Sequence, residues 1–272
     1  MPPVPALPAA TVTLVRDTHA SLEVLMLQRN FQSGFMPGMF LFPGGALDPG
    51  DQIAAVLTRC AGLDDVRASA AMGMQSGALG YWAAAIRESF EEAAVLLAYG
   101  DDGELVNPAA SERAQHYAEY RRKLNAGEDI LGEMLERERL RLAVDRLTYF
   151  SHWITPITAP RRYDTRFFVA VAPDGQEALP DNVEAIHHVW VNPAEAVERH
   201  RTGEFNMRTP TIRTLERFAP FTTADALIAH LRSQPVAPAI LPRIGPGGQR
   251  LLPGDSGYDE VASADAQGKW KT

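Results

Sequence analysis

The sequence predicts an α/β protein, in which helices cover both faces of a mixed β-sheet as an α/β/α sandwich with helical insertions. Segments with the character of strands come first and return after the middle of the chain, at residues 11–16, 22–29, 147–154, 162–171 and 183–191. A long helical segment at residues 81–99 separates the two groups, and further helix starts follow them. Elements mixed in this way must pack in layers to bury their apolar faces.

The composition is that of a folded globular protein. Hydrophobic residues make up 46% of the 272 residues, and the net charge is −8 with a pI near 5.4. An acidic balance argues against a nucleic-acid partner, because binding to phosphates needs a basic face. No apolar run reaches the roughly 18 residues of a membrane span, so we expect no membrane partner. Cys60 is the single cysteine and is interpreted as an apolar filler.

The first two strands are expected to form a β-hairpin, with its turn at residues 17–21. Residues 22–29 are largely apolar on both faces, so this strand is expected to be covered on both sides. Residues 31–39 contain glycine and proline and are predicted as a loop that leads into a short strand at residues 40–42.

Helical segments occupy the middle of the chain. Residues 51–75 have helical content with a break near Gly62, and the central helix at residues 81–99 carries a buried stripe at helical spacing. A second, mostly helical stretch at residues 108–147 starts with an asparagine and a proline at its first turn. Its arginines and glutamates are interpreted as a solvated face.

Near the end of the chain, capping residues predict helices that start at Asn192, Thr209 and residues 222–225. Prolines and glycines then accumulate after Ser233, which predicts an extended tail with a short strand near residues 249–252.

We therefore expect one domain at residues 1–234 and a Pro/Gly-rich C-terminal tail at residues 235–272. The helical insertions in the domain are expected at about residues 52–80 and 108–147.

Three glutamates, Glu88, Glu91 and Glu92, share one face of the central helix, because residues three and four apart are neighbours on a helix. Their mutual repulsion is relieved by a cation, and oxygen ligands at this density suit Mg²⁺ or Mn²⁺ rather than zinc. Arg87 is four residues before Glu91 and can hold one carboxylate in place. For the helix alone, a solvated acidic face is an equal alternative.

Together with a glycine turn upstream, these residues resemble the box of the Nudix hydrolases, G-x5-E-x7-R-E-U-x-E-E-x-G-U, where U is aliphatic. Gly44 and Gly45 are followed by Asp51 in the first glutamate position, and residues 87–95 match the other end of the box. Between Asp51 and Arg87 lie the 35 residues at 52–86, where the box has seven, so about 28 residues interrupt the box. This split resembles the branch typified by the peroxisomal coenzyme A diphosphatases, and flanking matches occur at residues 25–29, 34–37, 153–156 and 161–168.

The chain departs from the box at three positions. Asp51 replaces a glutamate, Ser89 replaces an aliphatic residue and Ala94 replaces a glycine. We expect Ala94 to lie in the helix interior, where alanine is better than glycine by about 1 kcal/mol.

The resemblance implies a Nudix fold with a metal site made by Glu88, Glu91 and Glu92 and by the main chain of Gly45. Glycine at these turn positions also lets the backbone at Gly44 approach substrate phosphate. Two residues are candidates for the general base, Glu91 and Glu184. For Glu184, a solvated carboxylate at a strand end is the alternative.

Three arginines are candidate substrate ligands, since guanidinium groups fit phosphate oxygens with two hydrogen bonds. These are Arg29, Arg162 and Arg166. The alternative for Arg162 and Arg166 is a structural pairing with Asp164, and for Arg29 a charge at the end of a strand.

The activity implied by the resemblance is hydrolysis of coenzyme A or acyl-coenzyme A to a phosphopantetheine and 3′,5′-ADP, with Mg²⁺ or Mn²⁺ as cofactor. An ADP-ribose or dinucleotide diphosphatase is the alternative enzyme, and a non-catalytic ligand-sensing module is the alternative of another class. The expected partner is a small nucleoside diphosphate derivative, and a homodimer stays open. Residues 269–272 are not a Ser-Lys-Leu peroxisomal address, so we expect a cytoplasmic protein.

The interruption of the box leads to one more expectation. Closing a loop of a few dozen residues costs little more than closing a short one, because the entropy grows with the logarithm of length. We therefore expect the insertion to leave the core geometry intact and to form a helical flap at the rim of the active site.

Overall fold

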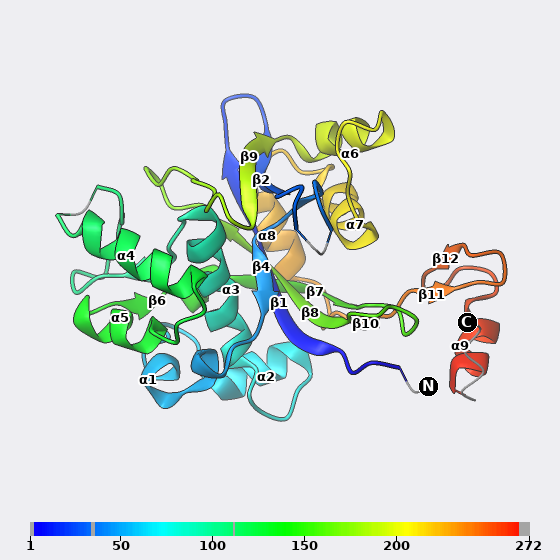
Figure 1. Ribbon diagram of the computed structural model, residues 1–272, viewed down its shortest axis with the longest axis horizontal. Helices are drawn as coiled ribbons and strands as arrows, with labels where there is room; N and C mark the ends of the chain where they lie inside the picture. Colours follow the sequence, from blue (N-terminus) through cyan, green and yellow to red (C-terminus); the bar gives the residue numbers. More distant parts are fainter. Residues whose placement is uncertain (1–2, 34–35, 111, 267–272) are drawn as a thin grey trace.

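The computed structural model describes residues 3–33, 36–110 and 112–266, and within them eight strands form a mixed sheet (Figure 1). The strands of this sheet are β1 (Leu7–Asp17), β2 (Leu22–Arg29), β3 (Phe40–Leu41), β4 (Gly44–Ala46), β7 (Thr148–Ile154), β8 (Tyr163–Val171), β9 (Ala185–Val191) and β10 (Ala239–Ile240). Their order is β10-β7-β8-β1-β2-β3, with β4 beside β1 and β9 beside β2. The β1–β8 and β10–β7 pairs are parallel and the others antiparallel, which confirms the predicted mixed sheet.

The α-helices of the described residues are α1 (Ala54–Leu57), α2 (Asp65–Met72), α3 (Leu79–Ala93), α4 (Ala114–Asn125), α5 (Leu131–Arg137), α6 (Pro193–Arg201), α7 (Thr209–Phe218), α8 (Ala224–Arg232) and α9 (Tyr258–Ala266). Short 3₁₀-helices and small strand pairs complete the fold, namely η1 (Pro49–Gln52), η2 (Val144–Arg146), β5 (Ala98–Tyr99) with β6 (Arg141–Leu142), and β11 (Arg243–Ile244) with β12 (Arg250–Leu251). Within the described ranges, every helix is too short or too polar to cross a lipid bilayer.

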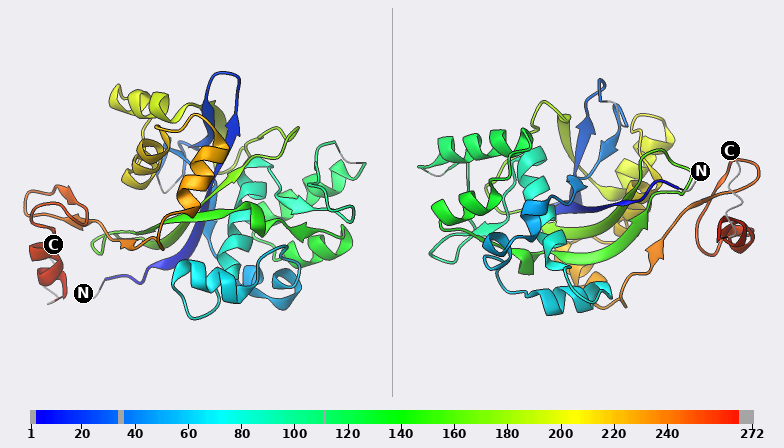
Figure 2. Two further views of the ribbon diagram at one scale, coloured as in Figure 1. Left: turned by 180° about the vertical axis from the view of Figure 1, so that it is seen from behind. Right: turned by 60° about the horizontal axis from the view of Figure 1, so that its bottom comes forward.

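Helices cover both faces of the sheet, as the sandwich prediction requires (Figures 1 and 2). One hydrophobic cluster lies between the sheet and α3, and a second lies between the sheet and α6, α7 and α8. In β2, Leu25 and Leu27 belong to the first cluster, whereas Val24 and Met26 belong to the second. The expectation that this strand is covered on both sides is confirmed.

β1 is longer than the predicted strand at residues 11–16. Its N-terminal part lies between two partners, with Ala10 paired to Arg166 of β8 on one side and to Gly45 of β4 on the other. Because these partners are distant in sequence, local alternation does not reveal this part of the strand.

α3 ends at Ala93 and not near residue 99, so the predicted end of the central helix is wrong. Ala94 has a φ of 59°, the left-handed conformation, and the N–H of Val95 bonds the carbonyl of Ser89 at 3.3 Å. Ser89 Oγ in turn donates to the carbonyl of Val95 at 2.9 Å. Ala94 therefore caps the helix instead of lying inside it. This is the position at which the Nudix box has glycine, the residue that adopts this conformation without a steric penalty.

The box insertion is part of the core, so the expectation of a flap at the active-site rim is wrong for α2. Ala68 and Met72 of α2 are buried in the cluster beneath α3. Asp65 of α2 accepts hydrogen bonds from the N–H groups of Gly77 and Leu79, at 2.8 and 2.9 Å, and so caps the first turn of α3. A helix rises about 1.5 Å per residue, which puts Leu79 roughly 18 Å from Glu91.

The predicted helix starts after the sheet are confirmed. Asn192 accepts hydrogen bonds from two N–H groups of α6, Thr223 accepts one from α8, and α7 begins at Thr209. The second helical stretch, predicted at residues 108–147, consists of α4 and α5 followed by β6 and η2.

The C-terminal part is less extended than predicted. β12 matches the expected short strand, whereas α9 was not predicted, and β10 lies beyond residue 234 yet pairs with β7 of the main sheet. β11, β12 and α9 stand to one side of the sandwich (Figure 1). Residues 34–35 of the predicted loop and the terminal residues 269–272 lie outside the described residues.

Candidate active site

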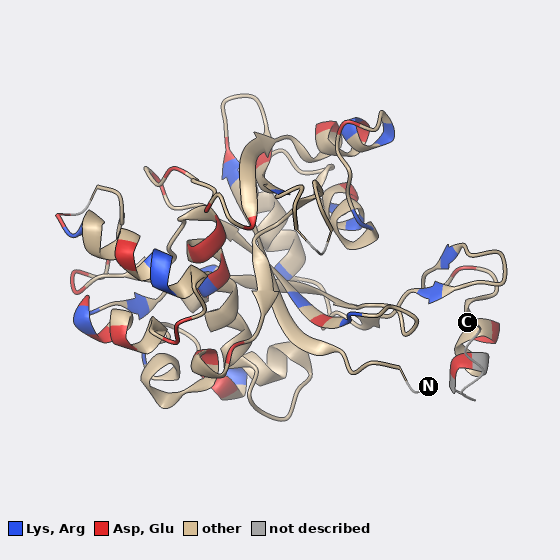
Figure 3. Cartoon of the chain, viewed as in Figure 1, with Lys and Arg blue, Asp and Glu red and all other residues tan. Residues whose placement is uncertain are grey.

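The three glutamates of the box lie on the last two turns of α3 and are buried. Glu88, Glu91 and Glu92 are 8%, 9% and 5% exposed, because α3 is enclosed by the sheet on one side and by α4 on the other. Acidic residues are visible along this end of α3 in Figure 3. The alternative of a solvated acidic face is therefore wrong.

The glycine turn meets these glutamates directly. The N–H of Gly44 donates to Glu92 Oε2 at 3.0 Å. A Cβ atom on Gly45 would lie 2.5 Å from Glu88 Oε1, so any side chain there would displace the carboxylate. The two ends of the interrupted box are thus in contact, and glycine is required because a carboxylate occupies the space of its side chain.

Arg87 joins the first acidic position of the box to the helix. Its guanidinium binds Asp51 through two hydrogen bonds, Nε to Oδ1 at 2.8 Å and Nη2 to Oδ2 at 3.0 Å. Nη1 donates to Glu88 Oε1 at 2.9 Å and to Glu91 Oε1 at 3.0 Å. Asp51 is fully buried. Although aspartate is shorter than the glutamate of the box, Asp51 still reaches Arg87. This ion pair joins the two ends of the box across the insertion.

Arg29 and Glu184 lie beside the cluster and form an ion pair at 2.7 Å. The charges of both residues act on the carboxyl group of Glu92. Asp181 accepts hydrogen bonds from consecutive N–H groups, including that of Glu184 at 3.0 Å, and fixes the turn that carries it. About half of the Glu184 side chain is exposed, so this carboxylate is accessible to water.

Arg162 and Arg166 are not gathered into the cluster. Arg162 donates to the carbonyl groups of Thr155 and Val4. Arg166 binds Asp164 and His152, which matches the alternative of a structural pairing. In the sheet, Arg166 is opposite Ala10, which is opposite Gly45. Two strand spacings put Arg166 roughly 10 Å from the glycine turn, so a role in substrate binding stays a prediction.

Burial sets the electrostatics of the cluster. Loss of hydration raises the pKa of Glu88 to about 8, and it raises the pKa values of Glu91, Glu92 and Asp51 above their ordinary ranges. The charge of Arg87 opposes this shift at Glu88, Glu91 and Asp51. A bound cation would favour the ionised form of these carboxyl groups, because an opposite charge nearby offsets the cost of burying theirs.

The donor set fits a hard divalent ion. Carboxylate oxygens are the ligands that Mg²⁺ and Mn²⁺ prefer, and the missing side chain at Gly45 leaves backbone next to Glu88. In the part of the chain that the structure describes, no three acidic, histidine or cysteine side chains already converge on one point. Arg87 Nη1 donates to both Glu88 and Glu91.

Two residues of α4 contact the end of α3, and neither is among the predicted site residues. Arg121 and Asn125 of α4 donate to main-chain carbonyls of the last turn of α3. The prediction that the charges of this stretch form a solvated face is wrong for Arg121, which donates to carbonyls of α3. A signal was present, because Arg121 lies on the helix face of the buried Tyr117 and Leu124.

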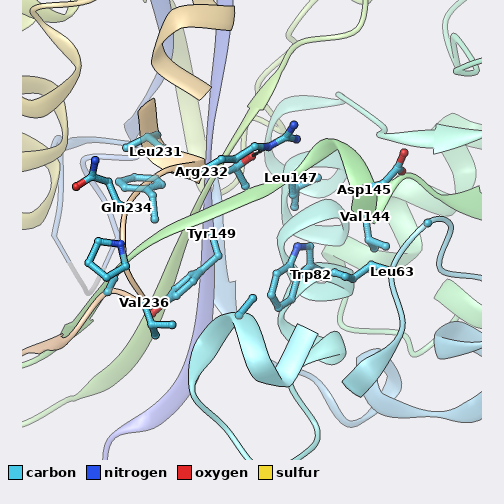
Figure 4. Close-up of a pocket in the computed structure, with 16 residues that line it drawn as sticks. Leu63, Trp82, Val144, Asp145, Leu147, Tyr149, Leu231, Arg232, Gln234 and Val236 are labelled. Carbon is cyan, nitrogen blue, oxygen red and sulfur yellow. Dashed lines mark hydrogen bonds between the residues drawn. The ribbon is translucent and has the colours of Figure 1, made fainter. Parts of the chain in front are cut away.

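A cavity of about 540 Å³ lies away from this cluster (Figure 4). Its walls include Leu63, Trp82, Tyr149 and Val236, and Trp82 belongs to the opposite end of α3 from the glutamates. None of the predicted site residues lines this cavity, so the chemistry of the box is not located there.

An α/β/α sandwich in which a glycine turn faces three glutamates of one helix defines the class of Nudix hydrolases, enzymes that split diphosphates. The NUDT19 Nudix domain matches residues 6–218, and the chain belongs to this family.

Curated relatives and a solved structure agree with this assignment. The acyl-coenzyme A diphosphatase NUDT19 of Gallus gallus is 29% identical over 277 residues, covering 88% of this chain and 73% of the relative. The protein of the same name from Homo sapiens is 27% identical, covering 88% and 72%. A crystal structure of a Nudix hydrolase from Alicyclobacillus acidocaldarius is 26% identical and covers 85% of this chain and 99% of its own, with a TM-score of 0.69.

Proposed function

We propose that this Nudix diphosphatase hydrolyses coenzyme A or its acyl esters, giving a phosphopantetheine and 3′,5′-ADP, and that it needs Mg²⁺ or Mn²⁺. The observation that carries the proposal is the contact between the Gly44–Gly45 turn and the glutamates of α3 across an interrupted box. The substrate is supported by the relatives named acyl-coenzyme A diphosphatase. The cytoplasmic location and a homodimer stay predictions.

Glu88, Glu91 and Glu92 would hold the ion, together with the main chain of Gly45. When bound, a divalent ion neutralises diphosphate oxygens and lowers the pKa of the attacking water. Arg87 fixes the carboxylates of Glu88 and Glu91 against each other, so the cluster is partly ordered before any ligand arrives.

The reaction needs a base that accepts a proton as water oxygen attacks phosphorus and the bond to the bridging oxygen breaks. Glu91 and Glu184 are the two candidates. Glu184 is about half exposed and accessible to water, and it forms an ion pair with Arg29 at 2.7 Å. Glu91 is buried and bonded to Arg87. The pH profiles of Glu91→Gln and Glu184→Gln separate them, since loss of the base removes the acidic limb.

Substrate contacts are proposed for Arg29, Gly44, Arg162 and Arg166. For Gly44 the support is its position in the glycine turn, where its N–H donates to Glu92 Oε2 at 3.0 Å. Arg166 lies about 10 Å from the glycine turn, a distance that suits a part of the substrate beyond the diphosphate.

The test is a substrate panel. The full chain is incubated with Mg²⁺ or Mn²⁺ and coenzyme A, an acyl-coenzyme A, ADP-ribose or a diadenosine polyphosphate, and the products are separated by chromatography. We expect 3′,5′-ADP from coenzyme A or its ester at the highest kcat/KM. Preferred turnover of ADP-ribose or of the dinucleotide would contradict the substrate assignment, and full activity in EDTA would contradict the metal.

Replacing one metal carboxylate is expected to remove most turnover. Glu91→Gln and Glu92→Gln each take one charge from the proposed metal site, so we expect kcat to fall at least tenfold. Glu119→Gln is the matched control, because this glutamate of α4 is exposed and pairs with Arg122 and Lys123 of the same helix. Retention of more than a tenth of wild-type activity by both variants would contradict the assignment of the metal site.

A further inference from the structure

The end of α3 that carries the glutamates is held by a cation from the second insertion. Arg121 of α4 donates from Nε to the carbonyl oxygens of Phe90 and Glu91, at 3.0 and 2.9 Å. Asn125, one turn further along α4, donates to the same carbonyl of Glu91 at 3.2 Å. Two side chains of one helix therefore bind the last turn of another.

These bonds meet a specific need of α3. The last four carbonyl groups of a helix have no partner within it and carry partial negative charge. Because Ala94 ends the helix, the carbonyl of Glu91 is among them, whereas that of Phe90 also accepts the N–H of Ala94 at 3.0 Å. A guanidinium supplies several donors in a fixed plane together with a positive charge, a combination that lysine and glutamine lack.

Arg121 also holds the segment that leads to Glu184. Its Nη2 donates to the carbonyl of Leu179 at 2.6 Å, and the N–H of Leu179 donates to the carbonyl of Ala93 at 2.9 Å. The charge of Asp181, which caps the turn at Glu184, acts on Arg121 as well. One side chain thus connects the helix of the metal carboxylates with the turn of the second candidate base.

We propose that Arg121 is a positioning residue of the active site, through which the α4 insertion fixes the carboxylates of Glu91 and Glu92 and the turn that carries Glu184. This role rests on the proposed metal-dependent function. It makes the second insertion a part of the catalytic unit, although the insertion contributes no residue to the box itself.

A positioning role of Arg121 can be distinguished from a purely electrostatic one, because the two predict opposite changes in metal affinity when Arg121 is replaced. A fixed positive charge near the carboxylates repels a metal ion, so removing it would strengthen metal binding if charge alone mattered. If Arg121 orders the ligands, removing it weakens metal binding, and loss of a group that orients metal ligands typically costs about 10–100-fold in affinity.

The experiment measures the Mn²⁺ dissociation constant by calorimetry without substrate for wild type, Arg121→Gln, Arg121→Lys and Arg122→Gln. We expect about tenfold or weaker binding for Arg121→Gln, a smaller loss for Arg121→Lys and no change for Arg122→Gln. Arg122 is the matched control, because it is adjacent, exposed and paired with Glu119 on the surface. In turnover assays, kcat of Arg121→Gln is expected to fall more than KM rises.

Unchanged or tighter Mn²⁺ binding by a folded Arg121→Gln would overturn the proposal. Thermal unfolding checks the fold, and if Arg121→Gln does not fold, Arg121→Lys and Asn125→Ala carry the same comparison. Wild type that binds Mn²⁺ but ignores coenzyme A would refute only the substrate assignment, and the variants would still decide the role of Arg121. Wild type that binds no Mn²⁺ would refute both proposals.

Discussion

At individual positions of the site, the space that neighbouring atoms leave limits which side chain the position can hold. Gly45 has no side chain because the Glu88 carboxylate fills that volume. Ala94, in contrast, occupies a left-handed position that favours glycine, since its Cβ is crowded there at a cost of roughly 1–2 kcal/mol. The first position allows no substitution without moving the carboxylate, whereas the second leaves room for improvement.

Ala94→Gly is therefore expected to stabilise the protein. Glycine removes the left-handed strain, which costs roughly 1–2 kcal/mol. It also raises the entropy of the unfolded chain, which destabilises the folded state by about 0.4–1 kcal/mol. The free energy of unfolding should therefore rise by about 0.5–1 kcal/mol. Urea unfolding measures the change. Ala93→Gly is the matched control, because Ala93 is still helical and buried, and there we expect a loss of about 1 kcal/mol. A destabilised Ala94→Gly would contradict the capping role.

The raised pKa of Glu88 predicts that the free energy of unfolding of the metal-free protein depends on pH. Its pKa of about 8 lies above the ordinary value of 4.5, so between these values the folded state binds more protons than the unfolded state. Stability must then fall as the pH rises through this window, by at most about 1.4 kcal/mol per pH unit for one group. Urea unfolding in EDTA at pH 5.5 and 8 measures the loss.

In Glu88→Gln this loss should shrink, since the titrating group is gone. Added Mg²⁺ should also reduce it in the wild type, because bound metal favours the ionised carboxylates. An identical pH dependence in Glu88→Gln would show that Glu88 does not titrate in this range.

Among the elements, α3 is secured at three points that lie far apart in the sequence. Asp65 of the box insertion caps its start, Asp51 binds Arg87 in its middle, and Arg121 of the second insertion binds its end. Both insertions therefore stabilise the helix of the box, one at each end. The geometry of the carboxylates depends on all three contacts.

Asp51→Asn tests the middle contact. It leaves the buried Arg87 without its two-bond partner, so we expect a loss of about 3 kcal/mol in the free energy of unfolding and a lower kcat. Chemical unfolding and turnover are measured side by side. Asp101→Asn serves as the control, because its contact with Arg139 is exposed, and a change below about 0.5 kcal/mol is expected. Equal effects of the two substitutions would argue against a structural pair at Asp51.

At the scale of the whole molecule, the box insertion and the residues after β10 differ in how they are attached to the core. The box insertion buries Val56, Ala68 and Met72 in the cluster beneath α3. The residues after β10 form β11, β12 and α9, which stand beside the sandwich (Figure 1). We expect the first segment to be essential for folding and the second to contribute little.

Replacement of residues 54–75 by a Gly-Ser linker is accordingly expected to abolish cooperative unfolding, because it removes buried side chains and the cap at Asp65. A chain that ends after residue 242 keeps β10 and is expected to unfold within a few °C of the full chain. Thermal unfolding followed by circular dichroism measures both. A cooperative transition in the linker variant near the wild-type temperature would place the insertion outside the core.

The sequence by itself determined what depends on near neighbours. The hairpin of β1 and β2, the helix starts at Asn192, Thr209 and Thr223, and the shared face of the glutamates all follow from side-chain period or local capping. The pairing of the glycine turn with the carboxylate helix was also visible, because the box residues resemble a known signature despite the interruption.

Only the tertiary structure decided the features that arise between distant segments. Burial of the glutamates, the N-terminal half of β1, the place of α2 at the far end of α3 and the binding of Arg121 to the helix end each need a partner remote in the chain. The end of α3 at Ala94 belongs with them, because alanine has a high helix propensity and no local signal for a left-handed cap. Propensity and periodicity describe a residue with its neighbours, whereas burial and ion pairing are set by what folds against it.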